Sequence, residues 1–354
     1  MTSPGEKALV IGAGSPLGTA VLRHLAAEDG IGIVAADNSA ACAFLAEAKP
    51  KFGKAAARIE IELFDPETGP LGFRRGMAEE LQERATRVFY LSHSRDRSES
   101  ASQIRYRNQA QKDAVLGLAN SAAQLRSLIV LSDVGLIGDY PGRFSEAWLN
   151  VGQIPFDEVD RSSLELETDC LRESRLPIVR ARVGLLSDLR GVLVRSRSWK
   201  SATEVLLPNI GWIRYLPRFL SIPYAVAPEA LAPLTPTEWA ARALVSLSSN
   251  PGAIGKAVHL VADPAPPMEQ ILRDVTGMAG GARVRGGVPT ALLRKLGALP
   301  GLRETARRQA DHLSAWWTPH RYCLSRNELD TFNARSLLPE TLAPPPPEKW
   351  VFER

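Results

Sequence analysis

Val10-Ile11-Gly12-Ala13-Gly14-Ser15-Pro16-Leu17-Gly18 lies near the start of the chain, between an apolar run at 8–11 and a segment, 17–25, whose apolar residues share one helical face. This pattern predicts a strand, a tight turn and a helix. Glycines permit positive φ and close backbone approach, and a helix N-terminus offers N–H groups to a pyrophosphate. Such a turn can also serve only to pack a strand against a helix. The predicted nucleotide-contacting residues here are Gly12, Gly14, Ser15, Pro16, Leu17 and Gly18.

An acidic residue follows the next expected strand, 33–36, about 20 residues after the turn, where a ribose-binding carboxylate belongs. We expect Asp37, followed by Asn38, to accept hydrogen bonds from the ribose hydroxyls of NAD. Its charge would repel the 2′-phosphate of NADP, so NAD(H) is favoured over NADP(H). The alternative is that Asp37 caps the helix expected at 40–45, and the two roles can coexist.

Strand-like and helix-like stretches alternate as far as residue 186, which predicts an α/β fold with a Rossmann-type, doubly wound parallel sheet. We assign this dinucleotide-binding domain to 1–190 and a smaller, less regular substrate-covering domain to 191–354, parts of which interleave with the first. Ligands bind beyond the carboxyl ends of such strands. The expected strands are 8–11, 33–36, 58–64, 88–91, 128–132, 178–182 and 258–261, and the main helices 17–25, 77–85, 108–124, 165–174 and 236–247.

Composition agrees with an enzyme of the cytoplasm. The chain has 354 residues, of which 45% are hydrophobic, enough for a sizeable core. Its polar start and the absence of an 18-residue apolar run argue against a signal peptide and a membrane span. The net charge of +4 comes without a nucleic-acid-binding module, so nucleic acid is not an expected partner. Three scattered cysteines, Cys42, Cys170 and Cys323, favour neither disulfides nor a metal site.

The chain resembles the extended short-chain dehydrogenase/reductase family over most of its length. The resemblance rests on the glycine turn, 37–39, Asp65, 89–92 and Asn108. Within the family, 138–146, 151–153, 236–241 and 259–260 resemble a branch that includes acyl-thioester and fatty-acyl reductases. The resemblance implies that Asp65, Leu91 and Ser92 also contact the cofactor.

The family's catalytic residues are replaced in this chain. Family members use a Ser or Thr at the end of the fifth strand, a Tyr, and a Lys four residues after that Tyr. The resemblance places these positions at Asp133, next to Ser132, and at Val159 and Ser163. Asp133, assisted by Ser132, is therefore the best remaining acid/base, although its carboxylate can instead bind neighbouring backbone or an arginine. His93, Tyr106 and Tyr140 are weaker candidates.

Three functions follow from this pattern. The first is an atypical enzyme that binds NAD(H) and performs a redox, elimination or isomerisation step on a small apolar or acyl-type substrate. The second is an inactive partner or regulatory subunit of an active relative, and the third a nonredox ligand-binding or lyase-type protein whose nucleotide cradle stays empty. The expected partners are an acyl carrier protein, a related subunit of the same family, or a second copy of this chain. Apolar side chains that favour an apolar substrate are Trp199, Trp212, Ile213, Tyr215, Leu216 and Phe219.

Overall fold

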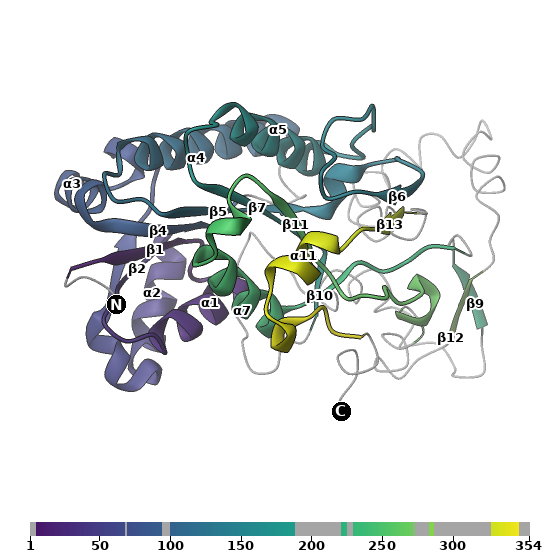
Figure 1. The fold of residues 1–354 in the computed structure, drawn as a ribbon, viewed down its shortest axis with the longest axis horizontal. Coiled ribbons are helices and arrows are strands. Elements are labelled where there is room, and N and C mark those ends of the chain that lie inside the picture. The colour runs from purple at the N-terminus through teal and green to yellow at the C-terminus, as the bar shows by residue number, and fades with distance from the viewer. Residues whose placement is uncertain are drawn as a thin grey trace.

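A seven-stranded parallel sheet forms the centre of the molecule (Figure 1). The structure is a computed structural model that describes residues 5–67, 69–93, 100–187, 221–224, 229–271, 273, 283–286 and 327–346. The strand order is β11-β7-β5-β4-β1-β2-β3, which confirms the doubly wound α/β fold expected from the sequence. The strands are β1 (Lys7–Ile11), β2 (Gly32–Asp37), β3 (Ile59–Leu63), β4 (Ala85–Tyr90), β5 (Ser127–Asp133), β7 (Ile178–Val183) and β11 (Ala257–Leu260).

Helices cover both faces of the sheet (Figure 1). One face carries α1 (Pro16–Ala26), α2 (Ser39–Ala48) and α7 (Thr237–Ser248), and the other α3 (Arg75–Arg84), α4 (Ala101–Ser121) and α5 (Glu158–Arg172). Because successive strand residues point to opposite faces, Ala8 and Val10 of β1 join the first core and Leu9 and Ile11 the second. A strand buried on both sides reads as a continuous apolar run, which is why 8–11 is a strong strand signal.

Two helices begin earlier than the sequence predicts. α4 starts at Ala101, not 108, and α5 at Glu158, not 165. Their first turns are polar and lack apolar periodicity, but capping side chains hold them. Ser100 and Gln103 form a reciprocal capping box, and Asp157 accepts a hydrogen bond from the N–H of Asp160.

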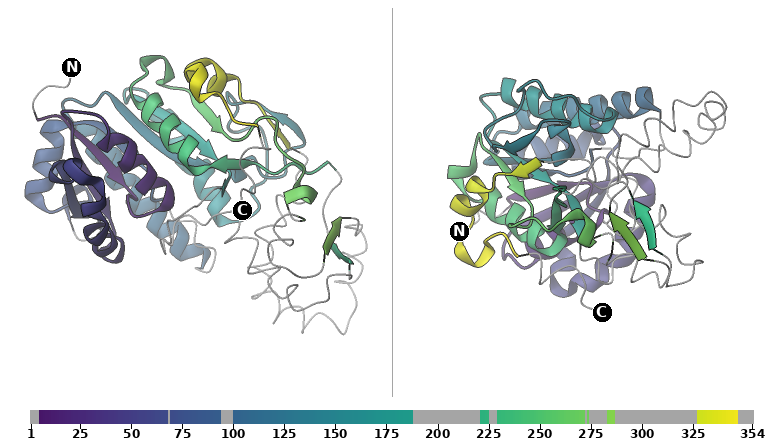
Figure 2. Two further views of the ribbon diagram at one scale, coloured as in Figure 1. Left: turned by 90° about the horizontal axis from the view of Figure 1, so that it is seen from below. Right: turned by 90° about the vertical axis from the view of Figure 1, so that its right-hand side faces the viewer.

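The chain beyond the predicted boundary at 190 contributes to the sheet. β11 is its edge strand next to β7, and α7 packs beside α1 in the same core. Three further strand pairs lie outside the sheet, and β9 with β12 is set apart from it (Figure 2). These pairs are β8 (Leu185–Ser187) with β10 (Leu234–Pro236), β6 (Gly142–Phe144) with β13 (Asn327–Leu329), and β9 (Ser221–Tyr224) with β12 (Arg283–Gly286).

Short helical elements complete the described chain. They are η1 (Lys49–Arg58), η2 (Pro70–Gly72), η3 (Val134–Ile137), η5 (Pro251–Ala253), α11 (Phe332–Leu337) and η6 (Glu340–Leu342). No helix among the described residues combines the length and apolar character that crossing a membrane requires. Cys42 and Cys170 are free thiols, while Cys323 lies outside the described residues.

Candidate functional site

The turn between β1 and α1 requires glycine at three positions. Gly12 has φ +87°, and a Cβ there would lie 2.8 Å from the Ser92 nitrogen. A Cβ on Gly18 would lie 2.1 Å from the Gly12 oxygen, and one on Gly14 would lie 2.6 Å from the Ala41 Cβ. The turn therefore packs directly against the end of β4 and the first turn of α2, at the carboxyl edge of the sheet.

Most N–H groups of the turn that leads into α1 already donate hydrogen bonds to other groups of the protein. Ser15 is the N-cap: its Oγ accepts from the Gly18 N–H at 2.9 Å and donates to the Gly12 oxygen at 2.7 Å. Pro16 has no N–H, and those of Gly12, Ala13, Gly14 and Ser15 already bind protein acceptors. Among the described residues, Leu17 is the one residue of this turn whose N–H has no hydrogen-bond acceptor.

Asp37 is bonded to the glycine turn, and we call the turn at 12–18 together with Asp37 the cradle. Its Oδ2 accepts the Gly14 N–H at 2.9 Å, and its Oδ1 accepts the backbone and side-chain N–H groups of Asn38 at 2.8 and 2.9 Å. Burial raises the pKa of this carboxyl, against the hydrogen bonds from Asn38 and Gly14, which lower it. Asn38, not Asp37, caps α2, through the Ala41 N–H. A carboxylate offers about four acceptor positions, so a ribose hydroxyl can still be bound.

The other predicted cofactor residues lie at neighbouring strand ends. The Leu91 N–H binds the Ile11 oxygen at 2.9 Å, which sets Ser92 against Gly12. Asp65 follows β3, and its carboxylate accepts the Glu67 N–H at 3.0 Å. The fold thus gathers these residues along one edge of the sheet.

Asp133 and Ser132 point to different environments. The Asp133 carboxylate is 3% exposed and caps η3 through the Gly135 N–H at 2.7 Å. The bond to neighbouring backbone that the sequence left open as an alternative is therefore present. Ser132 is fully buried, and its hydroxyl donates to Glu167 Oε1 of α5 at 2.5 Å.

Ser132 belongs to a buried polar network centred on Arg182. Glu167 of α5 accepts from Arg182 of β7 through Nε at 2.8 Å and Nη2 at 2.7 Å. Burial favours a raised pKa for Glu167, but the charges of Arg182 and Arg180 hold it below its ordinary value. The guanidinium of Arg182 also lies 3.1 Å from His259 Nε2.

His259 is neutral in this network. Burial first, and then the charge of Arg182, lower its pKa to about 3. Its Nδ1 lies 2.6 Å from the Asp330 carbonyl oxygen, so Nδ1 carries the proton and Nε2 accepts from Arg182. The sequence analysis does not predict this network. Two arginines, Arg180 and Arg182, inside an expected buried strand do indicate that buried hydrogen-bond acceptors must lie nearby.

Val159 and Ser163 lie one turn apart on the buried face of α5, the face that packs on β5 and η3. Neither side chain can serve as a general acid or carry a positive charge. Within the described ranges, the Ser163 hydroxyl is buried without a hydrogen-bond partner.

The three weaker acid/base candidates lie in different surroundings. His93 Nε2 lies 3.2 Å from Asn108 Nδ2 in the interior, while Tyr106 is 65% exposed on α4. Tyr140 packs edge-on against Phe144 and Trp148.

An apolar hollow of about 30 Å³ lies beside η3, directly after Asp133. Its lining is mostly apolar and includes Val134, Ile137, Leu231 and Pro233. The aromatic and apolar residues that the sequence suggests for a substrate pocket lie outside the described residues: Trp199, Trp212, Ile213, Tyr215, Leu216 and Phe219.

The comparisons with known proteins place the fold. No family model matches the sequence, and no curated protein is significantly similar to it. The terminal R domain of the myxalamid PKS-NRPS pathway is 20% identical, with 96% of this chain and 86% of that one covered and a TM-score of 0.70. UDP-glucuronic acid 4-epimerase from Bacillus cereus, solved with NAD, is 16% identical, with 96% and 91% covered and a TM-score of 0.60.

A third neighbour extends this likeness. An archaeal thiolation-reductase di-domain of a non-ribosomal peptide synthetase is 17% identical, with 79% of this chain and 61% of that one covered and a TM-score of 0.61. The chain therefore has the fold of extended short-chain dehydrogenases/reductases, as its sequence resemblance predicts, with solved neighbours among both epimerases and terminal reductase domains.

Proposed function

We propose that the protein binds NAD(H) in the cradle and carries out an atypical redox, elimination or isomerisation step on an apolar or acyl-type metabolite, with Asp133 as the proton-transfer group. The observation that carries the proposal is the juxtaposition of Asp37 with Gly14 at the entrance to α1. A buried carboxylate beside a glycine turn matches the ribose and phosphate groups of a dinucleotide. A bound nicotinamide would supply the hydride donor or acceptor.

The residues around the turn fit this group. Asp37 would hold the ribose, the Leu17 N–H and the positive end of α1 would face the phosphates, and Asp65 and Ser92 would border the nucleotide. The negative charge of Asp37 disfavours a 2′-phosphate, so we propose NAD(H) over NADP(H). The Bacillus cereus epimerase is bound to NAD and another solved neighbour, Gre2 from Candida albicans, to NADPH, so the neighbours do not select between the two cofactors.

Asp133 is the acid/base in this proposal because it ends β5, the strand whose end carries the family's catalytic hydroxyl, and because Val159 and Ser163 cannot transfer a proton. Positioned acid/base catalysis contributes roughly 10²–10⁴-fold in rate, so some group must replace the missing tyrosine in an active enzyme. The hollow beside η3 is lined mostly by apolar side chains, which supports an apolar group next to Asp133, although its volume of about 30 Å³ holds little more than one water molecule. The reductase neighbours support delivery of that substrate by an acyl carrier protein.

Titration calorimetry with NAD, NADH, NADP and NADPH tests the cofactor assignment. NAD or NADH is expected to bind more tightly than its phosphorylated counterpart, and Asp37→Asn to narrow that preference, because the amide keeps an acceptor but loses the charge. Asp29→Asn, an exposed change after α1, is the matched control. If none of the four nucleotides binds, the proposal fails and a nonredox ligand becomes the better reading of the cradle.

The catalytic assignment is tested on acyl-thioester substrates with Asp133→Asn. Asparagine keeps an oxygen to accept the Gly135 N–H but cannot take up a proton, so the η3 cap survives while activity is expected to fall by roughly 10²-fold or more. Full activity in this variant would eliminate Asp133 as the acid/base.

A second function is favoured by the bonds that Asp133 and Ser132 already make inside the protein. In this alternative the chain binds NAD(H) but serves as an inactive partner of an active relative or as half of a dimer. Affinity purification of the tagged protein under native conditions separates the two: recovery of a stoichiometric, active relative supports the partner role, and recovery of the chain alone counts against it.

A further inference from the structure

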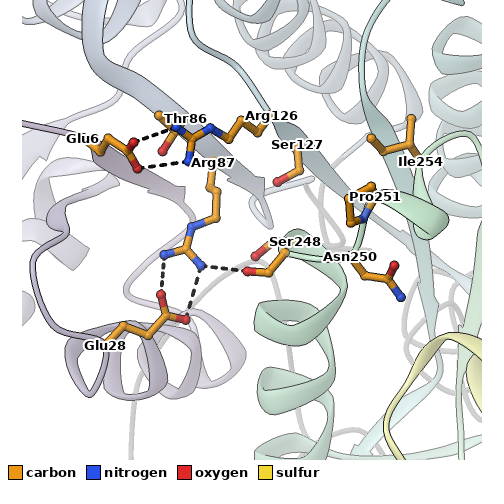
Figure 3. A pocket seen from close by; sticks show the side chains of 11 residues that line it. Glu6, Glu28, Thr86, Arg87, Arg126, Ser127, Ser248, Asn250, Pro251 and Ile254 are labelled. Atoms are coloured by element: carbon orange, nitrogen blue, oxygen red, sulfur yellow. Dashed lines mark hydrogen bonds and ion pairs between the residues drawn. The ribbon is translucent and has the colours of Figure 1, made fainter. Parts of the chain in front are cut away.

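A second polar cavity lies at the edge of the sheet opposite to the glycine turn. It has a volume of about 270 Å³ and opens where β1, β4 and β5 begin, between the ends of α1 and α7 (Figure 3). Its polar lining includes Glu6, Glu28, Arg87, Arg126, Ser127 and Ser249. Because the strands run parallel, this cavity and the cradle are separated by the full length of the strands.

Two ion pairs line this cavity, one above the other in Figure 3. Arg87 binds Glu28 through Nη1 at 3.2 Å and Nη2 at 2.5 Å, and its Nη1 also donates to Ser249 Oγ at 3.3 Å. Arg126 binds Glu6 through Nη1 at 3.3 Å and Nη2 at 2.7 Å. The two positive and two negative side chains leave these walls without net formal charge.

The walls retain unused hydrogen-bonding capacity. A guanidinium has five N–H donors, of which Arg87 uses three and Arg126 two in the bonds above. Ser127 is 2% exposed and points toward the cavity, and its hydroxyl has no hydrogen-bond partner within the described ranges (Figure 3). A buried hydroxyl without a partner is unfavourable, so a polar occupant that hydrogen-bonds to Ser127 would be stabilised there.

We propose that this cavity binds a small zwitterion that carries one carboxylate and one ammonium group, of the size of a free α-amino acid. The carboxylate would bind the spare N–H groups of Arg87 and Arg126, and the ammonium group Glu6 or Glu28. A multiply charged anion such as phosphate would meet both carboxylates and is disfavoured. The volume of about 270 Å³ is just below the usual range for pockets that bind drug-sized ligands, which suits a molecule as small as an amino acid.

The experiment screens the twenty standard L-amino acids, one at a time at millimolar concentration, for a rise in the Tm of the full chain, and measures hits by calorimetry. At least one is expected to bind, with and without NADH present, because the cavity does not share residues with the cradle. Arg87→Gln and Ser249→Trp, the second of which fills the cavity from its exposed rim, are each expected to weaken binding at least about tenfold. Arg75→Gln, in an exposed pair with Glu79, should leave it unchanged.

Three results would overturn the proposal: no amino acid raises the Tm, the hit binds Ser249→Trp as tightly as the natural chain, or inorganic phosphate binds in its place. If Arg87→Gln does not fold, Ser249→Trp alone decides. Since NADH binding is measured in the same samples, failure here is distinguishable from failure of the cradle.

Discussion

The close packing of the glycine turn leaves no room for a side chain at Gly18. A Cβ at this position would lie 2.1 Å from the Gly12 oxygen, an atom of the backbone that cannot move without opening the turn. We expect Gly18→Ala to lower the free energy of unfolding by about 2 kcal/mol or more, since overpacking typically costs 1–3 kcal/mol. Urea denaturation measures the change.

Gly76 is the matched control for this substitution. It lies in the first turn of α3 with no atom within 4 Å of a Cβ built on it. There Gly76→Ala should raise stability by about 0.5–1 kcal/mol, because alanine restricts the unfolded chain and favours helix. Equal effects of the two changes would mean that steric contact at Gly18 is not what requires glycine.

The sequence could place the predicted cofactor residues at one edge of the sheet because their signals are local. A turn that needs glycine, an acid at the end of the next strand and the polar ends of later strands can be read without knowing contacts. The partners of Arg182 could not be predicted in this way, because Glu167 lies 15 residues before it and His259 77 residues after it. Which buried acceptor meets which buried arginine is decided by the packing of α5 and β11 on β7.

Removing the carboxylate that joins α5 to β7 should be costly. Glu167→Gln leaves Arg182 charged, fully buried and without its counter-ion, a situation that costs about 3–5 kcal/mol. We expect the urea midpoint to fall accordingly. Glu79→Gln breaks an exposed pair with Arg75 on α3 and should change stability by no more than about 0.5 kcal/mol. A small effect of Glu167→Gln would mean that Arg180, Ser132 or water compensates the charge.

Glu146 connects the segment after β6 to β11 and to α11. It is 1% exposed and accepts the N–H groups of His259 and Asn333, and burial raises its pKa to about 7. In the unfolded chain its pKa returns to about 4.5, so the unfolded state loses its proton first as pH rises. The stability contributed by the protonated form is therefore complete below pH 4.5 and is lost as pH rises through about 7, by up to about 3 kcal/mol.

The measurement is urea unfolding at pH 5 and pH 8. Glu146→Gln cannot ionise and is expected to flatten the loss of stability between these two values by about 2–3 kcal/mol. Glu47→Gln, an exposed change on α2, is the control. The same slope in Glu146→Gln and the natural chain would show that this carboxyl titrates normally.

The contribution of His259 to stability changes with pH in the opposite direction: it is lost as pH falls. Its pKa falls from 6.5 to about 3 in the fold, so the unfolded chain binds a proton first as pH is lowered. The stability that neutral His259 permits is complete above pH 6.5 and is lost as pH falls through about 3. His259→Gln should therefore reduce the loss of stability between pH 6.5 and pH 4, measured by the same urea series. An unchanged acid slope would contradict the lowered pKa of His259 in the folded protein.

At the scale of the whole molecule, the sheet shares one core with α7, β11 and α11, which are described elements beyond residue 190. Trp239, Leu244 and Leu247 of α7 are buried with Leu17 and Val21 of α1. The sequence predicts the helix at 236–247 and the strand at 258–261 well, because both have regular apolar patterns. It does not say that this strand adds to the edge of the sheet, since strand pairing depends on contacts between segments far apart in the chain.

This arrangement makes a prediction about a fragment of residues 1–190. Without β11, β7 becomes an edge strand, and without α7 the apolar face of α1 is exposed. Each buried leucine removed costs about 2–5 kcal/mol, so losing Leu244 and Leu247 alone approaches the total stability of an ordinary domain. We expect the fragment to show no sharp urea transition and poor amide dispersion by NMR, whereas the full chain unfolds cooperatively. A fragment with a sharp transition and native-like dispersion would instead mean that 1–190 is an independent domain and that α7 and β11 only dock onto it.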